Sequence, residues 1–319
     1  MITLTLINLL HIWLDNLSPA DYAPTTVARY SSVIRRFLHW YDQQERRPAQ
    51  LADLTPITLV NYRSTLQQTQ STATTNVHIA ALRAWCLWLT QRGYLVENPT
   101  SYLKSISRVD RDAPEPLFNQ AVNALLRSAH RTRYGKRDYA ICQMLLQTGM
   151  RLGECQALTW QDITFQERKA FVLIRSGKGD KARTIPLNGS VRSALVGYIA
   201  PILGCDTKAK AVAAAWPVNY NSPLWQSQKG NQLSTTAIWR MFKQLVADCA
   251  SRGLVPADTT THHLRHTFAH HYLAKNPGDL VGLARLLGHT NLNTTKIYTQ
   301  PTFEELTTRV DQIPLNAYA

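Results

Sequence analysis

The sequence predicts a mainly α-helical protein with a small β-hairpin in its C-terminal part, an α+β fold built from two domains. Apolar residues recur at helical spacing through the first third of the 319-residue chain, which predicts a helical bundle over residues 1–105. Residues 106–116 mix both charges with two prolines and few apolar side chains, a composition typical of a linker. A β-hairpin pattern then interrupts further helical patterns in residues 117–319, the second domain.

Four helices with short connections account for the first domain. The opening segment carries an apolar face made of Leu6, Leu10, Trp13 and Leu17. Residues 25–47 predict the second helix, and Thr55 before Pro56 predicts the N-cap and first position of the third. The fourth helix is predicted over residues 75–92 and ends at Gly93. Its predicted apolar stripe consists of Val77, Ala80, Ala81, Ala84, Leu87 and Trp88.

The charge balance indicates a polyanionic partner. The chain carries a net charge of +14, with +3 in residues 1–105 and +11 in the remainder. An excess of this size favours nucleic acid over the alternative that the charge serves solubility alone. Exposed Arg, Gln, Thr and Ser side chains of the first domain suit contacts with DNA, and they suit a merely solvated face equally well.

The sequence also bears on the compartment. It has no run of about 18 uncharged apolar residues that would span a membrane. The opening residues lack the basic start and cleavage site of a signal peptide. The five cysteines are scattered and form no CxxC pair, which indicates a reducing environment. We therefore expect a cytoplasmic, nucleoid-associated protein.

The second domain opens with helical patterns, and these end at a segment with candidate catalytic residues, residues 148–154 (TGMRLGE). Thr148 and Gly149 break the chain, and a new helix begins with Arg151 at its start and Glu154 three residues later. Taken alone, the Arg151–Glu154 pair is a common surface interaction worth only a few tenths of a kcal/mol.

A hairpin follows at residues 170–187. Residues 171–174 are expected to form the first strand, residues 176–180 (SGKGD) the turn, and residues 183–187 the returning strand. Lys178 lies at the turn between two glycines. The segment does not match a phosphate-binding P-loop, so Lys178 alone is an ordinary solvated turn residue.

Residues 189–200 and 235–250 predict two more helices, separated by an irregular stretch rich in Trp, Asn and Pro. A further helix includes residues 261–272 (THHLRHTFAHHY), in which His262 and Arg265 are neighbours on one face. Histidines also recur every four residues there, which raises zinc as an alternative. No HExxH glutamate, cysteine or suitably spaced acidic residue accompanies them, so neither a metal nor another cofactor is expected.

The last segment of this kind spans Leu286 to Tyr298 (LLGHTNLNTTKIY). Gly288 and His289 end one apolar helix. Residues 293–295 are expected to cap a short new helix with Tyr298 in its first turn or two, near the positive end of the helix dipole, where a phosphate is stabilised. Taken alone, Tyr298 is an ordinary half-buried aromatic residue.

These four motifs stand in one order, and Tyr298 follows His289 by nine residues. In that order they resemble the tyrosine recombinase or phage integrase family, and within it the Xer-like and transposon-borne members. The resemblance covers about residues 117–300, and more weakly the helical domain, which is similar to the family's core-binding domain. The connection at residues 205–223 is longer than the family pattern, and no room is expected for a separate arm-type DNA-binding domain.

The resemblance implies a site-specific recombinase that cleaves and rejoins DNA through a 3′-phosphotyrosine intermediate. Arg151 and Arg265 match the two phosphate-clamping arginines, and Glu154 matches the acidic residue that steadies the first. Tyr298 matches the nucleophile. By the same resemblance, the proton-transfer and phosphate-binding residues are Lys178 as general acid, His262 as base and His289 as a hydrogen-bond donor to the phosphate.

These residue types suit that chemistry. Negative charge builds on the non-bridging phosphate oxygens, which a guanidinium matches in a bidentate way that lysine does not. A free tyrosine has a pKa of about 10, so neighbouring cations or a base must offset a deficit of about 4 kcal/mol near pH 7. Because rejoining reverses cleavage, neither ATP nor a metal is implied.

The implied partner is double-stranded DNA, bound by four copies of the chain, or by copies together with a related recombinase, on two recombination sites. One rival interpretation, an inactive DNA-binding relative, predicts loss of Arg151, Arg265 or Tyr298. A second, a type IB topoisomerase, shares the nucleophile but relaxes supercoils as a monomer. A third, an RNA-binding protein, leaves the order of the motifs unexplained.

The tail after Pro301 predicts a short helix over residues 302–310. Its apolar stripe consists of Phe303, Leu306, Val310 and Ile313. A helix this short needs a groove in which to bury that stripe. The groove belongs either to its own domain or, as the resemblance favours, to a neighbouring protomer.

Overall fold

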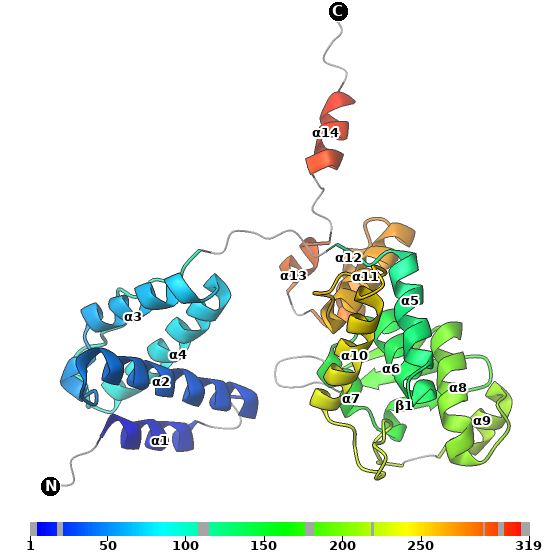
Figure 1. The fold of residues 1–319 in the computed structure, drawn as a ribbon, viewed down its shortest axis with the longest axis horizontal. Helices are drawn as coiled ribbons and strands as arrows, with labels where there is room; N and C mark the ends of the chain where they lie inside the picture. Colours follow the sequence, from blue (N-terminus) through cyan, green and yellow to red (C-terminus); the bar gives the residue numbers. More distant parts are fainter. Residues whose placement is uncertain are drawn as a thin grey trace, which may run out of the picture. The chain divides into compact units, whose positions relative to one another are not determined.

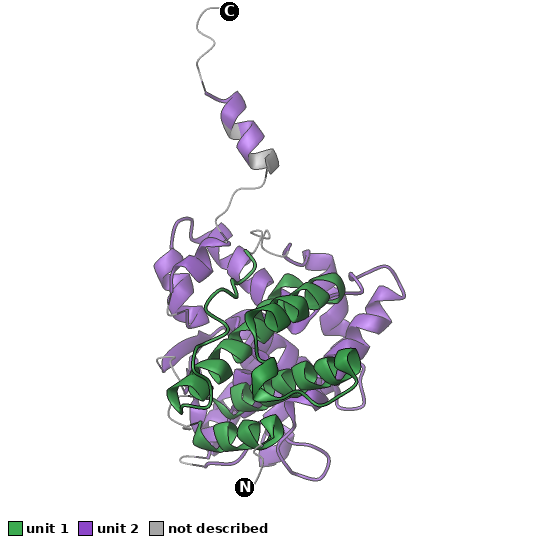
Figure 2. Cartoon of the chain, turned by 90° about the vertical axis from the view of Figure 1, so that its left-hand side faces the viewer, with its two compact units in different colours: residues 1–111 green, residues 112–319 purple. Residues whose placement is uncertain are grey.

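A computed structural model describes residues 5–17, 22–107, 115–175, 182–217, 220–289, 291–298 and 303–313 (Figure 1). The chain forms two compact units, residues 1–111 (unit 1) and 112–319 (unit 2), coloured separately in Figure 2. The division falls inside the segment predicted as a linker. Both units are mainly helical and the described strands form one small sheet, so the predicted fold class is confirmed.

Unit 1 is a bundle of four helices and one short 3-10 turn. The elements are α1 (Leu6–Asn16), α2 (Pro24–Glu45), η1 (Leu51–Asp53), α3 (Pro56–Thr69) and α4 (Thr72–Gln91). Trp13, Phe37 and Trp85 meet in its core and are almost fully buried. The predicted start of α3 is confirmed, because the Thr55 hydroxyl accepts a hydrogen bond from the Thr58 amide and Pro56 occupies the first helical position.

The predicted stripe of α4 is wrong by about one position. Ala80 and Leu87 are exposed, whereas His78, Leu82 and Trp85 are buried. The reason is that larger apolar side chains at helical spacing, Ile79, Leu82, Trp85, Cys86 and Leu89, form the buried face. His78 lies on the same face, and its Nδ1 is 2.9 Å from the Tyr62 hydroxyl, which gives this buried polar atom a partner. The helix also begins earlier than predicted, at an N-cap provided by Ser71.

Unit 2 places helices around a small sheet (Figure 1). Its helices before the sheet are α5 (Asn119–His130), α6 (Gly135–Thr148), α7 (Leu152–Ala157) and the 3-10 turn η2 (Trp160–Asp162). The helices after it are α8 (Gly189–Leu203), α9 (Ala209–Ala215), α10 (Thr235–Ala250), α11 (Thr261–Lys275), α12 (Leu280–Leu287), α13 (Asn293–Lys296) and α14 (Phe303–Asp311). Helix α6 is central, since it packs against α5, α8 and α11.

The sheet has the antiparallel order β1 (Ile163–Phe165), β2 (Ala170–Ile174) and β3 (Arg183–Leu187). The two predicted hairpin strands are confirmed, with Ile174 opposite Arg183 and Ala170 opposite Leu187. The turn that contains Lys178 lies outside the described residues. Alternation along β3 places Arg183, Ile185 and Leu187 on the same buried face, so an arginine occupies a core position of the sheet.

Besides the two 3-10 turns, one short strand and one short helix were not predicted. Strand β1 has three residues, too few to show a period of two. Helix α9 lies in the stretch predicted to be irregular, where the alanine-rich run AKAVAAA favours helix and Val212 is buried.

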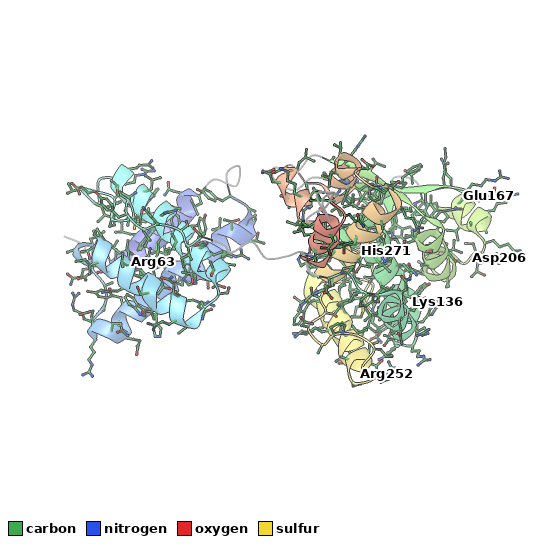
Figure 3. All side chains as sticks on the ribbon, turned by 90° about the horizontal axis from the view of Figure 1, so that it is seen from above. Arg63, Lys136, Glu167, Asp206, Arg252 and His271 are labelled. Carbon is green, nitrogen blue, oxygen red and sulfur yellow. The ribbon has the colours of Figure 1, made fainter. Side chains whose placement is uncertain are left out.

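The surface of unit 2 carries charges of both signs. Lys136 and Arg252 are exposed, as are the acidic Glu167 and Asp206 (Figure 3). Within the described part of the chain, no helix combines the length and the apolar character needed to cross a membrane.

Candidate active site

The junction between α6 and α7 forms the first part of the site. Gly149 ends α6 in a left-handed conformation with φ of 63°. A Cβ there would also lie 2.5 Å from Phe268 and 2.8 Å from Leu287, so the position requires glycine for two independent reasons. In this conformation the Gly149 carbonyl accepts a hydrogen bond from Nη1 of Arg265, at 2.7 Å.

Arg151 and Glu154 are joined as the sequence predicts. Arg151 is the N-cap of α7, its amide donates to Glu154 Oε2 at 2.8 Å, and its Nη1 donates to Oε1 at 3.0 Å. The Arg151 side chain is 39% exposed and that of Glu154 15%. The carboxylate therefore holds an arginine whose guanidinium remains accessible to a ligand.

Glu154 also binds a residue that the sequence analysis missed. Arg183 Nη2 lies 2.7 Å from Glu154 Oε2, and Nη1 lies 3.1 Å from Oε1. Burial acts to raise the pKa of Glu154, but the hydrogen bonds from Arg183 and from the Arg151 amide outweigh it and lower that pKa. The signal that could have found Arg183 is the period of two in β3, which puts it in phase with Ile185 and Leu187.

Arg265 lies deeper in unit 2, on α11. Besides the Gly149 carbonyl, it donates from Nη2 to the Leu287 carbonyl at 2.8 Å and lies 2.9 Å from Nε2 of His289. Burial, followed by the nearby charge of Arg151, lowers the pKa of Arg265 to about 10. The guanidinium therefore remains charged at neutral pH, and the proximity of Arg151 makes the site strongly attractive to an anion.

His289 has a defined tautomer. An arginine can only donate, so Nε2 accepts from Arg265 and the hydrogen lies on Nδ1. Nδ1 donates to the hydroxyl of Thr295 at 2.8 Å. Thr295 is completely buried, and the sequence analysis gave it only a capping role. Its actual partner lies six residues before it, across the turn between α12 and α13.

The position of Tyr298 corrects one prediction. Helix α13 is a single turn, Asn293–Lys296, with Leu292 as an N-cap that makes no side-chain cap bond. The amide of Asn293 is bound instead by the Asn291 side chain at 2.9 Å. Tyr298 follows the C-terminal end of α13, so it does not lie at the positive end of that helix dipole. Nearby positive charge comes from Arg265 instead.

The Tyr298 side chain is buried in a small cluster with Ala269, Leu283 and Leu287. Its ring centroid is 5.4 Å from that of His266 and 5.7 Å from that of His270. Burial raises the pKa of Tyr298, and the charge and hydrogen bond of Arg265 only partly oppose this effect. In this conformation the phenol is therefore less acidic than a free tyrosine.

Two histidines beside Tyr298 were considered only as zinc ligands in the sequence. His266 Nδ1 and His270 Nε2 are buried and have no hydrogen-bond partner among the described residues. Burial and neighbouring histidines lower the pKa of His266 to about 4, so it is neutral at physiological pH. No cluster of three His, Cys, Asp or Glu side chains suited to a metal occurs in the described ranges.

His262 is exposed at the start of α11. Desolvation by the surrounding protein, followed by the charges of Arg265 and Arg151, lowers its pKa. It is therefore neutral near pH 7 and able to accept a proton. A cavity of about 520 Å³ lies between β3 and the end of α12, and Arg183, Arg285 and His289 are among the residues that line it.

The structure thus brings together six of the seven residues predicted for the site. These are Arg151, Glu154, His262, Arg265, His289 and Tyr298, which are linked by hydrogen bonds or by their mutual effects on pKa. The seventh, Lys178, lies outside the described residues. The arrangement can bind an anion between two guanidiniums and present a phenol and a neutral imidazole beside it.

Comparison with known proteins gives consistent results over both units. Residues 116–305 match the phage integrase family, and residues 10–93 match the phage integrase N-terminal SAM-like domain. Tyrosine recombinase XerC of Roseiflexus sp. (strain RS-1) is 30% identical over 283 residues, 88% of this chain and 84% of the relative. Tyrosine recombinase XerD of Halalkalibacterium halodurans is 30% identical over 281 residues, 87% of each chain.

Solved structures of similar fold include DNA complexes. The XerH recombinase in a post-cleavage complex with a palindromic difH substrate has a TM-score of 0.68 at 24% identity, over 90% of this chain and 79% of that one. The Tn1549 transposon integrase with a circular intermediate DNA has a TM-score of 0.70 at 20% identity, over 97% of this chain and 99% of that one. At these identities the similarity establishes the shared fold alone.

Proposed function

The chain belongs to the phage integrase family of tyrosine recombinases, enzymes that cleave and rejoin DNA strands at specific sites, and we propose that Tyr298 is its nucleophile. In this proposal the phenol oxygen attacks a backbone phosphorus of duplex DNA. A bond forms between Tyr298 and phosphorus, the bond to the 5′ oxygen breaks, and the product is a 3′-phosphotyrosine with a free 5′ hydroxyl. The hydroxyl of a second strand then reverses the step.

The observation that carries this proposal is the pairing of Arg151 and Arg265 beside Tyr298. Burial is the main cause of the lowered pKa of Arg265, and the charge of Arg151 is the next, so the two guanidiniums lie within electrostatic reach of each other. Two like charges held so close are costly unless an anion joins them. A phosphodiester whose non-bridging oxygens gain charge in the transition state fits between them, and each donor is worth roughly 10²–10³ in rate.

The proton transfers are assigned from donor and acceptor capacity. His262 is neutral and accepts the proton of the phenol. His289 donates its Nδ1–H to Thr295 and accepts from Arg265 at Nε2, so it has no hydrogen for the phosphate in the conformation described. In this proposal it binds the phosphate once Nε2 has released Arg265 and taken up a proton. Lys178, on the hairpin turn, supplies the proton to the leaving 5′ oxygen. Glu154 keeps Arg151 in place, and none of these steps requires a metal or another cofactor.

The buried position of Tyr298 adds a condition. Its ring is 8% exposed and its pKa is raised, so the phenol does not meet a phosphate in the conformation described. We expect DNA binding to release Tyr298 from its cluster with Ala269 and Leu287, toward His262, while the phenol stays beside Arg265. Each site must therefore be bound before it is cut.

We extend the proposal to the assembly. The partner is double-stranded DNA, bound by four copies of the chain, or by copies together with a related recombinase, on two sites. Leu306 and Val310 of α14 and Ile313 just after it are exposed, which suits a helix that docks on a neighbouring protomer. The same activity implies a protein that works on the nucleoid in the cytoplasm.

The proposal is tested by covalent trapping. The target is first selected by gel shift from a pool of random-sequence duplexes, and a nicked suicide version is then made. The wild-type chain is expected to form an adduct that survives denaturant, and Tyr298→Phe is expected to bind the duplex without forming it. Tyr272→Phe is the matched control, because that tyrosine bonds Asp279 and plays no part in the reaction. An adduct with Tyr298→Phe would exclude this nucleophile.

The same substrate separates the recombinase from a topoisomerase. We expect strand exchange between two paired sites and little relaxation of a plasmid that lacks the site. Efficient relaxation of such a plasmid by the wild-type chain, without exchange, would favour the topoisomerase interpretation.

A further inference from the structure

Arg183 is a buried charge that the proposed chemistry does not use. Its side chain is 6% exposed and lies on the inner face of β3, opposite Ile174. An apolar residue in phase with Ile185 and Leu187 would fill that face without burying a charge, and such replacements are often as stable as a buried ion pair. The stability of the sheet therefore does not explain why an arginine occupies this position.

The contacts of Arg183 reach two separate parts of the site. Nη1 and Nη2 bind the two oxygens of Glu154, at 3.1 and 2.7 Å. Nε donates to the Leu286 carbonyl at the C-terminal end of α12, at 2.8 Å. One rigid, planar guanidinium thus fixes a carboxylate relative to a helix end.

The end of α12 is held by two arginines. The Leu286 carbonyl accepts a hydrogen bond from Arg183 and the Leu287 carbonyl accepts one from Arg265, so consecutive acceptors at the negative end of the helix are each bound by a cation. The next residue, Gly288, turns with φ of 67° so close to Arg183 that a Cβ would lie 2.6 Å from Nη1. The position of the Gly288–His289 segment therefore depends on where Arg183 lies.

We propose that Arg183 is a positioning residue for strand cleavage, which sets the distance between Arg151 and the Arg265–His289 pair. It holds Arg151 through Glu154, and it holds His289 and Arg265 through the end of α12. This inference rests on the proposed function. Arg183 touches neither the phosphate nor Tyr298 in this proposal. It keeps Arg151 at a fixed distance from Arg265 and His289.

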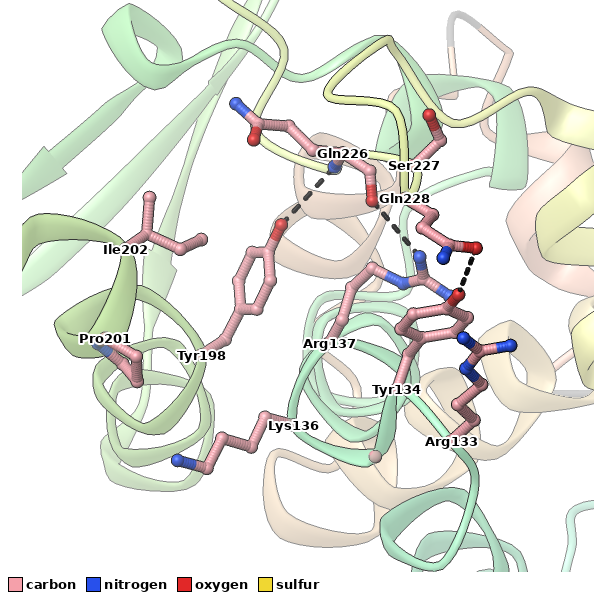
Figure 4. A pocket seen from close by; sticks show the side chains of 11 residues that line it. Arg133, Tyr134, Lys136, Arg137, Tyr198, Pro201, Ile202, Gln226, Ser227 and Gln228 are labelled. Atoms are coloured by element: carbon pink, nitrogen blue, oxygen red, sulfur yellow. Dashed lines mark hydrogen bonds between the residues drawn. The ribbon is translucent and has the colours of Figure 1, made fainter.

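Arg137 provides a matched control. It donates twice to a carboxylate, from Nε and Nη2 to Asp138 at 2.9 and 2.7 Å, and once to a backbone carbonyl, from Nη1 to Gln226 at 3.1 Å. It lines a different cavity, shown in Figure 4. Arg137 is in the first turn of α6 and Gly149 follows the last, about 18 Å along the helix.

The test compares Arg183→Lys and Arg183→Gln with Arg137→Lys, in the full-length chain. Gel shift on the selected duplex measures binding, and single-turnover adduct formation on its nicked version measures cleavage. We expect Arg183→Lys to bind within about twofold of the wild-type chain and to cleave roughly tenfold to a hundredfold more slowly, because a misplacement near 1 Å has effects of that size. Arg137→Lys is expected to cleave at the wild-type rate.

A pH profile separates positioning from simple loss of structure. Glu154 faces the cations Arg151, Arg183 and Arg265, and it must be ionised to hold Arg151. Protonation of His262, the proposed base, sets the first loss of cleavage as the pH falls, and protonation of Glu154 adds a second loss at lower pH. Without the charge of residue 183 the pKa of Glu154 rises, so this second loss should move to higher pH in Arg183→Gln and much less in Arg183→Lys.

Each outcome decides the question. If the wild-type chain forms no adduct on the selected duplex, the proposed function fails. If it does, and Arg183→Lys cleaves as fast as the wild-type chain or is slowed no more than Arg137→Lys, the positioning role is wrong. Arg183→Lys alone decides the rate comparison if Arg183→Gln does not fold. In a folded Arg183→Gln chain, a Glu154-dependent loss of cleavage at the wild-type pH would also overturn the positioning role.

Discussion

Replacing Thr295 with valine removes one hydroxyl group from the centre of the site. The side chain is completely buried, and its oxygen lies 2.8 Å from Nδ1 of His289. Valine has nearly the same shape, so the change deletes an acceptor rather than creating a cavity. The Nδ1–H of His289 then loses the hydroxyl that fixes its hydrogen and its ring orientation.

The size of the effect follows from that single bond. Loss of a buried hydrogen bond of this kind costs about 1–3 kcal/mol of stability, and about 2–12 °C in Tm for a domain of this size. Arg265 still donates to Nε2, so the preference for the correct tautomer is weakened rather than reversed. If about 1–2 kcal/mol of that loss reaches the transition state, cleavage slows about 5- to 30-fold, which is less than the loss of a phosphate donor.

Single-turnover cleavage of the nicked duplex measures this effect, with Thr295→Ser as the control that retains the hydroxyl. We expect the serine variant to cleave within about threefold of the wild-type chain, because only a methyl group is lost. Equal rates for the valine and serine variants would refute the argument that Thr295 orients His289.

Two further outcomes are expected. Arg265→Lys should bind DNA normally but cleave roughly 10²–10³-fold more slowly. One ammonium group cannot replace the planar guanidinium that binds Gly149, Leu287 and His289 together. Near-normal cleavage would exclude Arg265 as a phosphate clamp. A chain ending at Thr302 lacks α14 and its exposed apolar side chains. It should still bind a single site by gel shift but lose synapsis and most strand exchange. Exchange at the full-length rate would show that the tail is dispensable.

Most of the helical framework could be predicted because periodicity and local signals agree there. Gly149 ends α6, and α10 has the predicted bounds. The prediction failed in α4, where the predicted stripe included the small Ala80 and the exposed Leu87 while the larger Leu82 and Trp85 are the buried residues. It also failed for β1 and α9, which are too short for periodicity to show.

The sequence predicted which side chains form the site but not the hydrogen bonds that hold them together. Arginine, histidine and tyrosine can be recognised in motifs. No sequence pattern shows that the backbone carbonyls of Gly149, Leu286 and Leu287 accept hydrogen bonds from the arginines. Thr295 was interpreted as a cap because threonine often has that role. Its bond to His289 depends on the turn between α12 and α13, which only the folded chain defines.

The covered position of Tyr298 has a consequence for fidelity. A cell contains a vast excess of phosphodiesters that are not recombination sites, and a strand cut at one of them has no partner strand to join. On the proposal that Tyr298 is the nucleophile, the ring must leave its contacts with Ala269, Leu283 and Leu287 before it can react, and the free energy of uncovering it has to come from binding. A DNA segment that makes only some of the correct contacts would supply too little of that energy. On the same proposal, burial of one aromatic ring acts as a proofreading step, which would make the enzyme selective in cutting beyond its selectivity in binding.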